Sequence, residues 1–153
     1  IFSAAELLKI LNDEICETAS RGMFVTMVIG IYDSNKKELL LSNAGHEPPL
    51  IFSKGETFSN LEEAGPPLGI APKFKFTEKL ISFKESSMYI FTDGITEMKD
   101  TNGEMLGQEG FQNYIKKYQN TVNSQRLKKI IEDLIKSGRI QKDDLTIVAI
   151  DSK

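Results

Sequence analysis

The sequence predicts an α+β domain whose β-structure is largely antiparallel. Two observations predict it: helical periodicity is confined to one segment at the start and two near the end, and short apolar runs separated by polar turns fill the middle. With 153 residues, of which 40% are hydrophobic, we expect residues 1–153 to form a single domain with its own core. The order of a helix, several strands, two helices and a last strand is typical of helices packed on sheet faces.

The first helix is expected at residues 4–18. Ser3 and Glu6 have the spacing of a capping box, with Ser3 as the N-cap. Leu8, Leu11 and Ile15 then recur at helical spacing, which predicts one buried face.

The strands begin with residues 23–32, which are apolar at both alternating sets of positions and so predict a central strand covered on both sides. A hairpin turn at 33–36 leads to a returning strand at 38–44. The later strands are expected at 50–52, 76–83 and 88–91, with turns at 54–56 and 84–87.

Two polar or glycine-rich segments are predicted to be irregular. Residues 65–69 (Gly-Pro-Pro-Leu-Gly) form either a plain connector or a surface flap beside a site. Residues 99–104 could be aligned with a calcium loop only by placing Met98 at its first position, so a tight turn is favoured.

Two helices and a strand complete the chain. Apolar spacing predicts one helix across 111–118 and a stronger one across 127–135. The second helix is expected to be capped near Asn123 or Ser124 and to be ended by Gly138. The last strand is expected at 145–150.

Composition narrows the classes of function. A net charge of −3 and no cluster of basic residues argue against nucleic acid as the main partner. The single cysteine, Cys16, fits a reducing compartment, and no apolar run reaches membrane-spanning length. We therefore expect a cytoplasmic location, on its own or as the cytoplasmic part of a longer membrane-attached protein.

Two acids are the candidate metal ligands. Asp93 follows the apolar run 88–91 and precedes Gly94, whose permissive backbone is expected to let the chain turn away there. Asp143 and Asp144 stand just before the last predicted strand. Carboxylates at strand ends, distant in sequence, are the oxygen donors that a hard dication prefers. A purely structural domain would instead leave Asp93 and Asp143 on opposite sides of the molecule.

Five motifs resemble one family across the whole chain. The chain is similar to the metal-dependent protein phosphatases (the PPM superfamily), in the branch of sporulation stage II protein E and the sigma-factor-regulating serine phosphatases. The motifs lie, in family order, at residues 43–46, 65–69, 92–97, 103–107 and 143–146. The resemblance implies a sandwich of two mainly antiparallel sheets flanked by helices, and hydrolysis of phosphoserine or phosphothreonine on a protein.

The resemblance also implies a site with two Mn²⁺ or Mg²⁺ ions and a metal-activated water, without a protein nucleophile. Asp93 and Asp143 match metal ligands of the family. Gly94 would allow the backbone to come close to the metal. Asp144 would contact the metal ligands without binding the metal itself. Glu97 is either a solvated turn acid or an outer partner of the metal, and His46 is expected to have a structural role, its ring bonded to nearby backbone.

The family's first metal motif, a Gly-Asp followed shortly by another Asp, is absent from this sequence, as are the strands that carry it. Since the chain also starts at Ile1 rather than Met, we expect a fragment of a longer enzyme with an incomplete metal site, inactive or weakly active alone. The implied partners are a phosphoprotein, such as an anti-sigma antagonist, a second copy of the chain, and an upstream sensor or regulatory domain. The alternative is a non-catalytic module that binds or dimerises.

Overall fold

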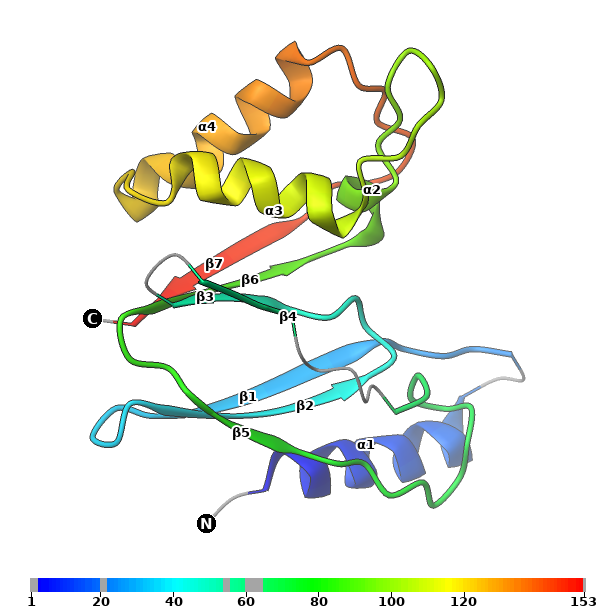
Figure 1. Ribbon diagram of the computed structural model, residues 1–153. Helices are drawn as coiled ribbons and strands as arrows, with labels where there is room; N and C mark the ends of the chain where they lie inside the picture. The colour runs from blue at the N-terminus through cyan, green and yellow to red at the C-terminus, as the bar shows by residue number, and fades with distance from the viewer. Residues whose placement is uncertain (1–2, 20–21, 54–55, 60–64, 153) are drawn as a thin grey trace. The chain divides into compact units, whose positions relative to one another are not determined.

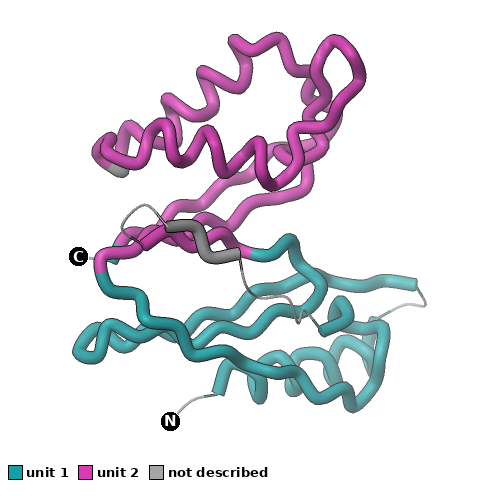
Figure 2. Tube along the Cα trace, in the orientation of Figure 1, with its two compact units in different colours: residues 1–48, 59–84, 152 teal, residues 49–58, 85–151, 153 magenta. Residues whose placement is uncertain are grey.

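The computed structural model describes residues 3–19, 22–53, 56–59 and 65–152. Its contacts divide the chain into two compact units, shown in Figure 2. Unit 1 comprises Ile1–Pro48, Ser59–Lys84 and Ser152, and unit 2 comprises Pro49–Phe58, Glu85–Asp151 and Lys153. Each unit has one antiparallel sheet and its own helix or helices, which confirms the α+β class with two antiparallel sheets. The expectation of a single domain stays a prediction.

The helices and strands lie in Figure 1 as follows. Unit 1 contains α1 (Ala4–Thr18), β1 (Met27–Asp33), β2 (Glu38–Ala44) and β5 (Lys79–Ser82). Unit 2 contains β3 (Leu50–Ser53), β4 (Glu56–Ser59, whose last residue is assigned to unit 1), β6 (Ser86–Phe91), α2 (Asp93–Thr96), α3 (Gly107–Tyr118), α4 (Asn123–Lys136) and β7 (Ile147–Asp151).

The helix α1 has the predicted bounds and N-cap. The Ser3 hydroxyl accepts the Glu6 amide proton at 3.1 Å, as in the first half of a capping box. The other anchor comes from far along the chain, because Glu78 Oε2 accepts hydrogen bonds from the Ser3 hydroxyl and the Ala5 amide at 2.8 and 3.0 Å. Ala4 and Leu8 are fully buried on the face that α1 turns toward its sheet.

The sheet of unit 1 has the order β1-β2-β5, and all its described pairings are antiparallel. The Asp33 carboxylate closes the predicted hairpin turn by accepting the Asn35 and Lys36 amide protons. The prediction of a central, doubly covered strand at 23–32 is wrong for the described chain: the regular strand starts at Met27 and pairs on one side only. Apolar side chains on both faces of a strand do not by themselves mean that other elements pack against both faces.

A buried asparagine holds the irregular segment of unit 1 against α1. Asn12 is completely buried, its side-chain oxygen accepts the Gly69 amide proton at 3.0 Å, and its side-chain nitrogen donates to the Ala71 carbonyl at 2.9 Å. Leu68 also exchanges two backbone hydrogen bonds with Val25. The segment 65–69 is therefore anchored at several points, and Leu68 is part of the small core of unit 1.

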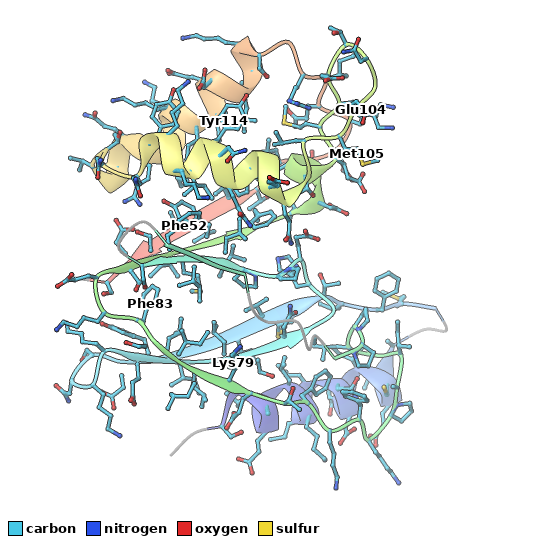
Figure 3. The ribbon with its side chains drawn as sticks, viewed as in Figure 1. Phe52, Lys79, Phe83, Glu104, Met105 and Tyr114 are labelled. Atoms are coloured by element: carbon cyan, nitrogen blue, oxygen red, sulfur yellow. The ribbon has the colours of Figure 1, made fainter. Side chains whose placement is uncertain are left out.

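The sheet of unit 2 has the order β4-β3-β6-β7, and α3 and α4 cover one of its faces (Figure 1). Its core joins this face to the two helices, with the Phe91 and Phe111 rings edge to face at 4.9 Å. Phe52 on β3 and Tyr114 on α3, both labelled in Figure 3, belong to the same cluster. This core holds the end of β6, where the candidate site begins.

The remaining predictions differ from the structure at several boundaries. The strand predicted at 76–83 is shorter, and a turn follows it at residues 84–85, inside the predicted segment 84–87. Because β5 and β6 belong to different sheets, this turn does not close a hairpin. The strand β4 was not predicted, and most of the turn expected at 54–56 lies outside the described residues. The helix α4 begins after Val122 rather than after a polar cap, and ends as predicted before Gly138, whose φ is +75°.

The segment 99–104 forms the predicted tight turn. The Asp100 carboxylate accepts the Asn102 and Glu104 amide protons at 2.9 and 3.0 Å, and Gly103 has a φ of +87°. The carboxylate is thus used to close the turn.

The α3–α4 pair has an acid-sensitive contact. The Lys117 ammonium and the Tyr118 hydroxyl donate to Asp133 Oδ2 at 2.6 and 2.9 Å, and the hydrogen bond from Lys117, followed by that from Tyr118, lowers the pKa of Asp133. A lowered pKa in the folded state stabilises the protein at pH values above the ordinary carboxyl pKa, and this stability is lost as the pH falls through the lowered value.

We expect the unfolding temperature to fall less steeply below about pH 4 in the Asp133→Asn variant than in the parent, because the variant has no carboxylate to protonate. Thermal unfolding across this range measures it, and parallel curves for parent and variant would contradict it.

Candidate metal site

Asp93 stands at the end of a buried strand. The chain passes from the core to the surface just before Asp93: Phe91 is 1% exposed, Thr92 is half-buried and Asp93 is exposed. Asp93 is also the first residue of α2, the one-turn helix that follows β6. The strand therefore holds the Asp93 backbone in place while its carboxylate is accessible to solvent.

Asp143 and Asp144 precede β7 and are both exposed. The Asp144 amide donates to Asp143 Oδ1 at 2.7 Å, which orients the Asp143 carboxylate. The Gln141 side-chain amide donates to the Asp143 carbonyl at 2.9 Å. Hydrogen bonds within the segment before β7 thus hold both the side chain and the backbone of Asp143.

Thr92 joins the two acidic segments. The β6–β7 ladder runs to the pair Phe91 and Ile147. Beyond it, the Thr92 amide donates to the Thr146 carbonyl at 3.2 Å, and the Thr92 hydroxyl accepts the Thr146 amide proton at 3.1 Å. The same hydroxyl donates to the Asp144 carbonyl at 3.2 Å. Sequence reasoning assigned no role to Thr92, although a hydroxyl residue directly before the Asp-Gly pair was a usable signal.

Gly94 lies directly against the Asp143–Asp144 backbone. A Cβ atom at Gly94 would be 2.3 Å from the Asp144 carbonyl oxygen and 3.4 Å from that of Asp143. Gly94 is not among the residues with positive φ, so the position needs glycine for its missing side chain and not for a left-handed backbone. This corrects the expectation that the glycine serves to turn the chain.

The structure therefore brings four predicted residues together at one end of the β6–β7 pair: Asp93, Gly94, Asp143 and Asp144. The alternative in which Asp93 and Asp143 lie on opposite sides of the molecule is therefore wrong. Glu97 ends α2, is exposed, and its amide donates to the Asp93 carbonyl at 2.9 Å. Its role as an outer partner of a metal stays a prediction.

His46 belongs to unit 1, whereas the four clustered residues belong to unit 2. The Asn43 side chain holds its backbone, accepting from the His46 amide and donating to the His46 carbonyl, each at 2.9 Å. The ring Nδ1 lies 3.2 Å from the Thr26 hydroxyl. The ring partner is therefore a side chain, which corrects the expected bond to backbone, while the role of His46 stays a prediction.

The donor chemistry of the cluster fits part of a dication shell. Carboxylate oxygens are the ligands that Mg²⁺ and Mn²⁺ prefer, and Asp93 and Asp143 are both exposed and lie just beyond one end of the β6–β7 ladder. Within the described residues, no group of three or more His, Cys, Asp and Glu side chains is arranged to hold a metal ion. Two carboxylates supply only some of the roughly six oxygens of such a shell.

The fold of two antiparallel sheets with helices matches that of solved PP2C-type phosphatase domains. The structure is similar to the PP2C domain of SiaA from Pseudomonas aeruginosa, with a TM-score of 0.80 and 15% identity over 97% of this chain and 61% of that one. It is also similar to RsbX in complex with magnesium, with a TM-score of 0.65 and 19% identity over 94% of this chain and 62% of that one.

The chain belongs to the family of stage II sporulation protein E (SpoIIE), whose model matches residues 2–153. Among curated relatives it is similar to the phosphoserine phosphatase RsbU of Bacillus subtilis (strain 168), with 30% identity over 152 residues. That match covers 97% of this chain and 45% of RsbU, so the chain spans less than half of this relative. The resemblance inferred from the five motifs is thus confirmed.

Proposed function

We propose that this chain is part of a metal-dependent phosphatase that removes phosphate from phosphoserine or phosphothreonine of a regulatory protein. The observation that carries the proposal is the joining of the Asp93 and Asp143 segments through Thr92 and Gly94. The similarity to a phosphoserine phosphatase and to a magnesium-bound relative supports it.

Within the site, Asp93 and Asp143 would each give carboxylate oxygens to Mn²⁺ or Mg²⁺. When bound, such a pair of ions supplies an activated water for attack on phosphorus and neutralises phosphate charge. Thr92 keeps the two segments in register through its three hydrogen bonds. Asp144 positions Asp143 through its amide, and Gly94 lets the two backbones lie in contact. We propose that residues outside this chain complete the metal shell.

The setting of this activity is also proposed. The substrate would be a phosphorylated anti-sigma antagonist or a related regulator, and the whole protein would carry an upstream sensor or regulatory domain and act as a homodimer. No helix in the described parts of the chain is long and apolar enough to cross a membrane. A cytoplasmic location stays a prediction.

The test is phosphate release from a phosphoserine peptide with Mn²⁺ and with EDTA. It is run on this chain and on a version extended upstream in the same reading frame. Manganese-dependent release by the extended chain, with little or none by this chain alone, is expected. Release by neither, while both remain folded by circular dichroism, would contradict the proposal and favour the non-catalytic binding module.

A further inference from the structure

Unit 2 has a small three-stranded ladder next to the candidate metal site. Lys99 is its middle residue and pairs with Met105 on one side and with Ile140 on the other, both in antiparallel fashion. Lys99 and Ile140 exchange two backbone hydrogen bonds of 3.4 and 2.8 Å. Figure 1 shows the 98–106 turn beside the segment that leads to β7, and Figure 3 labels Met105 on this turn. None of these three residues has a role in the proposed metal site.

One face of the ladder is buried and the other is open. Met98 precedes Lys99 and Leu106 follows Met105, and both are in the core of unit 2, at 2% and 8% exposure. Successive residues of a strand point to opposite faces, and residues directly opposite each other in an antiparallel pair point to the same face. The side chains of Met105, Lys99 and Ile140 therefore form a row on the open face, which we call the outer row.

The two ends of the outer row are apolar and exposed. Met105 is 55% exposed and Ile140 is 58% exposed. Lys99 between them is half-buried, and the alkyl part of a lysine can lie along apolar neighbours while its ammonium stays in water. The outer row is thus a small apolar surface that continues across three segments of backbone.

The backbone under the outer row is held in place. Arg139 Nη1 donates to the Met98 carbonyl at 3.2 Å and to the Glu104 carbonyl at 3.1 Å, which ties the segment before β7 to the 98–106 turn. The Asp100 carboxylate closes the same turn through two amide protons. Because the backbone is already ordered, a ligand that binds here does not have to order it.

The charges around the outer row balance. The segments 97–106 and 139–142 contain three acids and three bases: Glu97, Asp100 and Glu104, and Lys99, Arg139 and Lys142. The net charge of the two segments is therefore zero, so this surface favours neither an anionic nor a cationic ligand. Apolar contact is what the outer row offers.

The outer row lies close to Asp143. Three residue steps lead from Ile140 to Asp143, so the two Cα atoms are no more than about 11 Å apart. An extended peptide spans the same distance in about three residues. A substrate whose phosphoserine is bound at Asp93 and Asp143 can therefore place a side chain about three positions away on the outer row.

We propose that the outer row binds an aliphatic side chain of the phosphoprotein substrate, about three residues from the phosphoserine. Met105 and Ile140 contact this side chain, and the unbranched Met105 adapts to its shape. The inference rests on the proposed phosphatase activity and adds to it a preference for the sequence around the phosphoserine.

Phosphoserine peptides that differ at two positions test this preference. Leucine is placed three residues before or three residues after the phosphoserine, and in the other peptides both positions are alanine, aspartate or lysine. Manganese-dependent phosphate release by the extended chain gives kcat/KM for each. We expect one leucine peptide to exceed the alanine peptide by about tenfold, and the charged peptides to resemble alanine. The small substrate p-nitrophenyl phosphate reports the metal site alone.

Variants of the outer row test the contacts. Met105→Ala and Ile140→Ala change exposed side chains, and each is expected to lower kcat/KM for the preferred leucine peptide by about fivefold. Neither should change the hydrolysis of p-nitrophenyl phosphate. Thr101→Ala, which changes an exposed residue of the same turn, is the matched control and should change neither substrate. A leucine preference that persists when Met105 and Ile140 are both alanine would overturn the proposal.

The two proposals fail in different ways. Hydrolysis of p-nitrophenyl phosphate with equal kcat/KM for the leucine and alanine peptides would overturn the outer row as a binding surface and leave the phosphatase activity standing. Hydrolysis of no substrate would contradict the activity. NMR titration of this chain then decides about the outer row: a leucine peptide should shift the Met105 and Ile140 methyl signals and the alanine peptide should not. Equal shifts with both peptides, or shifts that follow protein concentration alone and so report a second copy, would overturn it.

Discussion

Asp93→Asn and Asp143→Asn are each expected to lower manganese-dependent phosphate release by about 100-fold or more in the extended chain. Each substitution keeps the shape of the side chain but removes the charge that a dication requires. Both acids are exposed, so the free energy of unfolding should change by no more than about 0.5 kcal/mol. Large loss of activity with little loss of stability is the signature of a ligand and not of a structural residue.

Two measurements separate a metal ligand from an indirect effect. Mn²⁺ broadens the NMR signals of nuclei close to it, and in the parent we expect this for residues near Asp93, Asp143 and Thr92. Either variant should abolish the broadening. Glu109→Gln, which removes an exposed acid from α3, is the matched control and should keep both the broadening and the activity. Parent-like turnover in both aspartate variants would refute the proposed site.

Gly94→Ala is expected to lower the free energy of unfolding by about 2 kcal/mol or more and to abolish the proposed activity. The new Cβ would lie 2.3 Å from the Asp144 carbonyl oxygen, a backbone atom that cannot move alone. Alanine is favoured over glycine in a helix by about 1 kcal/mol, so propensity alone predicts the opposite sign. We expect the contact to dominate and to displace the backbone of Asp143 and Asp144.

Gly30→Ala is the matched control for this substitution. Its Cβ would meet the methyl ends of Leu41 and Leu39 at 3.0 and 3.4 Å, and these side chains can adjust. The stability should change by no more than about 1 kcal/mol. Chemical denaturation of both variants gives the comparison, and a Gly94→Ala protein as stable as the Gly30→Ala protein would show that the Asp144 backbone yields easily.

The sequence predicted best where short-range patterns act alone. The capping residue Ser3 and the apolar spacing after it gave α1 its bounds, and the Asp33 turn set the β1–β2 hairpin. It predicted poorly where contacts between segments far apart in the sequence decide the structure. Which strand pairs with β5, and that β1 pairs on one side only in the described chain, depend on which strands meet in space. The cap of α4 was misplaced because no polar side chain caps that helix.

The sequence by itself determined the family, the α+β class and the two candidate metal ligands, because motif spacing and strand-end acids are local features of the chain. Only the tertiary structure decided that Asp93 and Asp143 share one end of the β6–β7 pair. About fifty residues separate them, and the β6–β7 register, the Thr92 hydrogen bonds and the missing side chain of Gly94 bring them together. The buried Arg126 side chain depends likewise on partners from β6 and β7, Tyr89 and Asp151, which sequence periodicity cannot place.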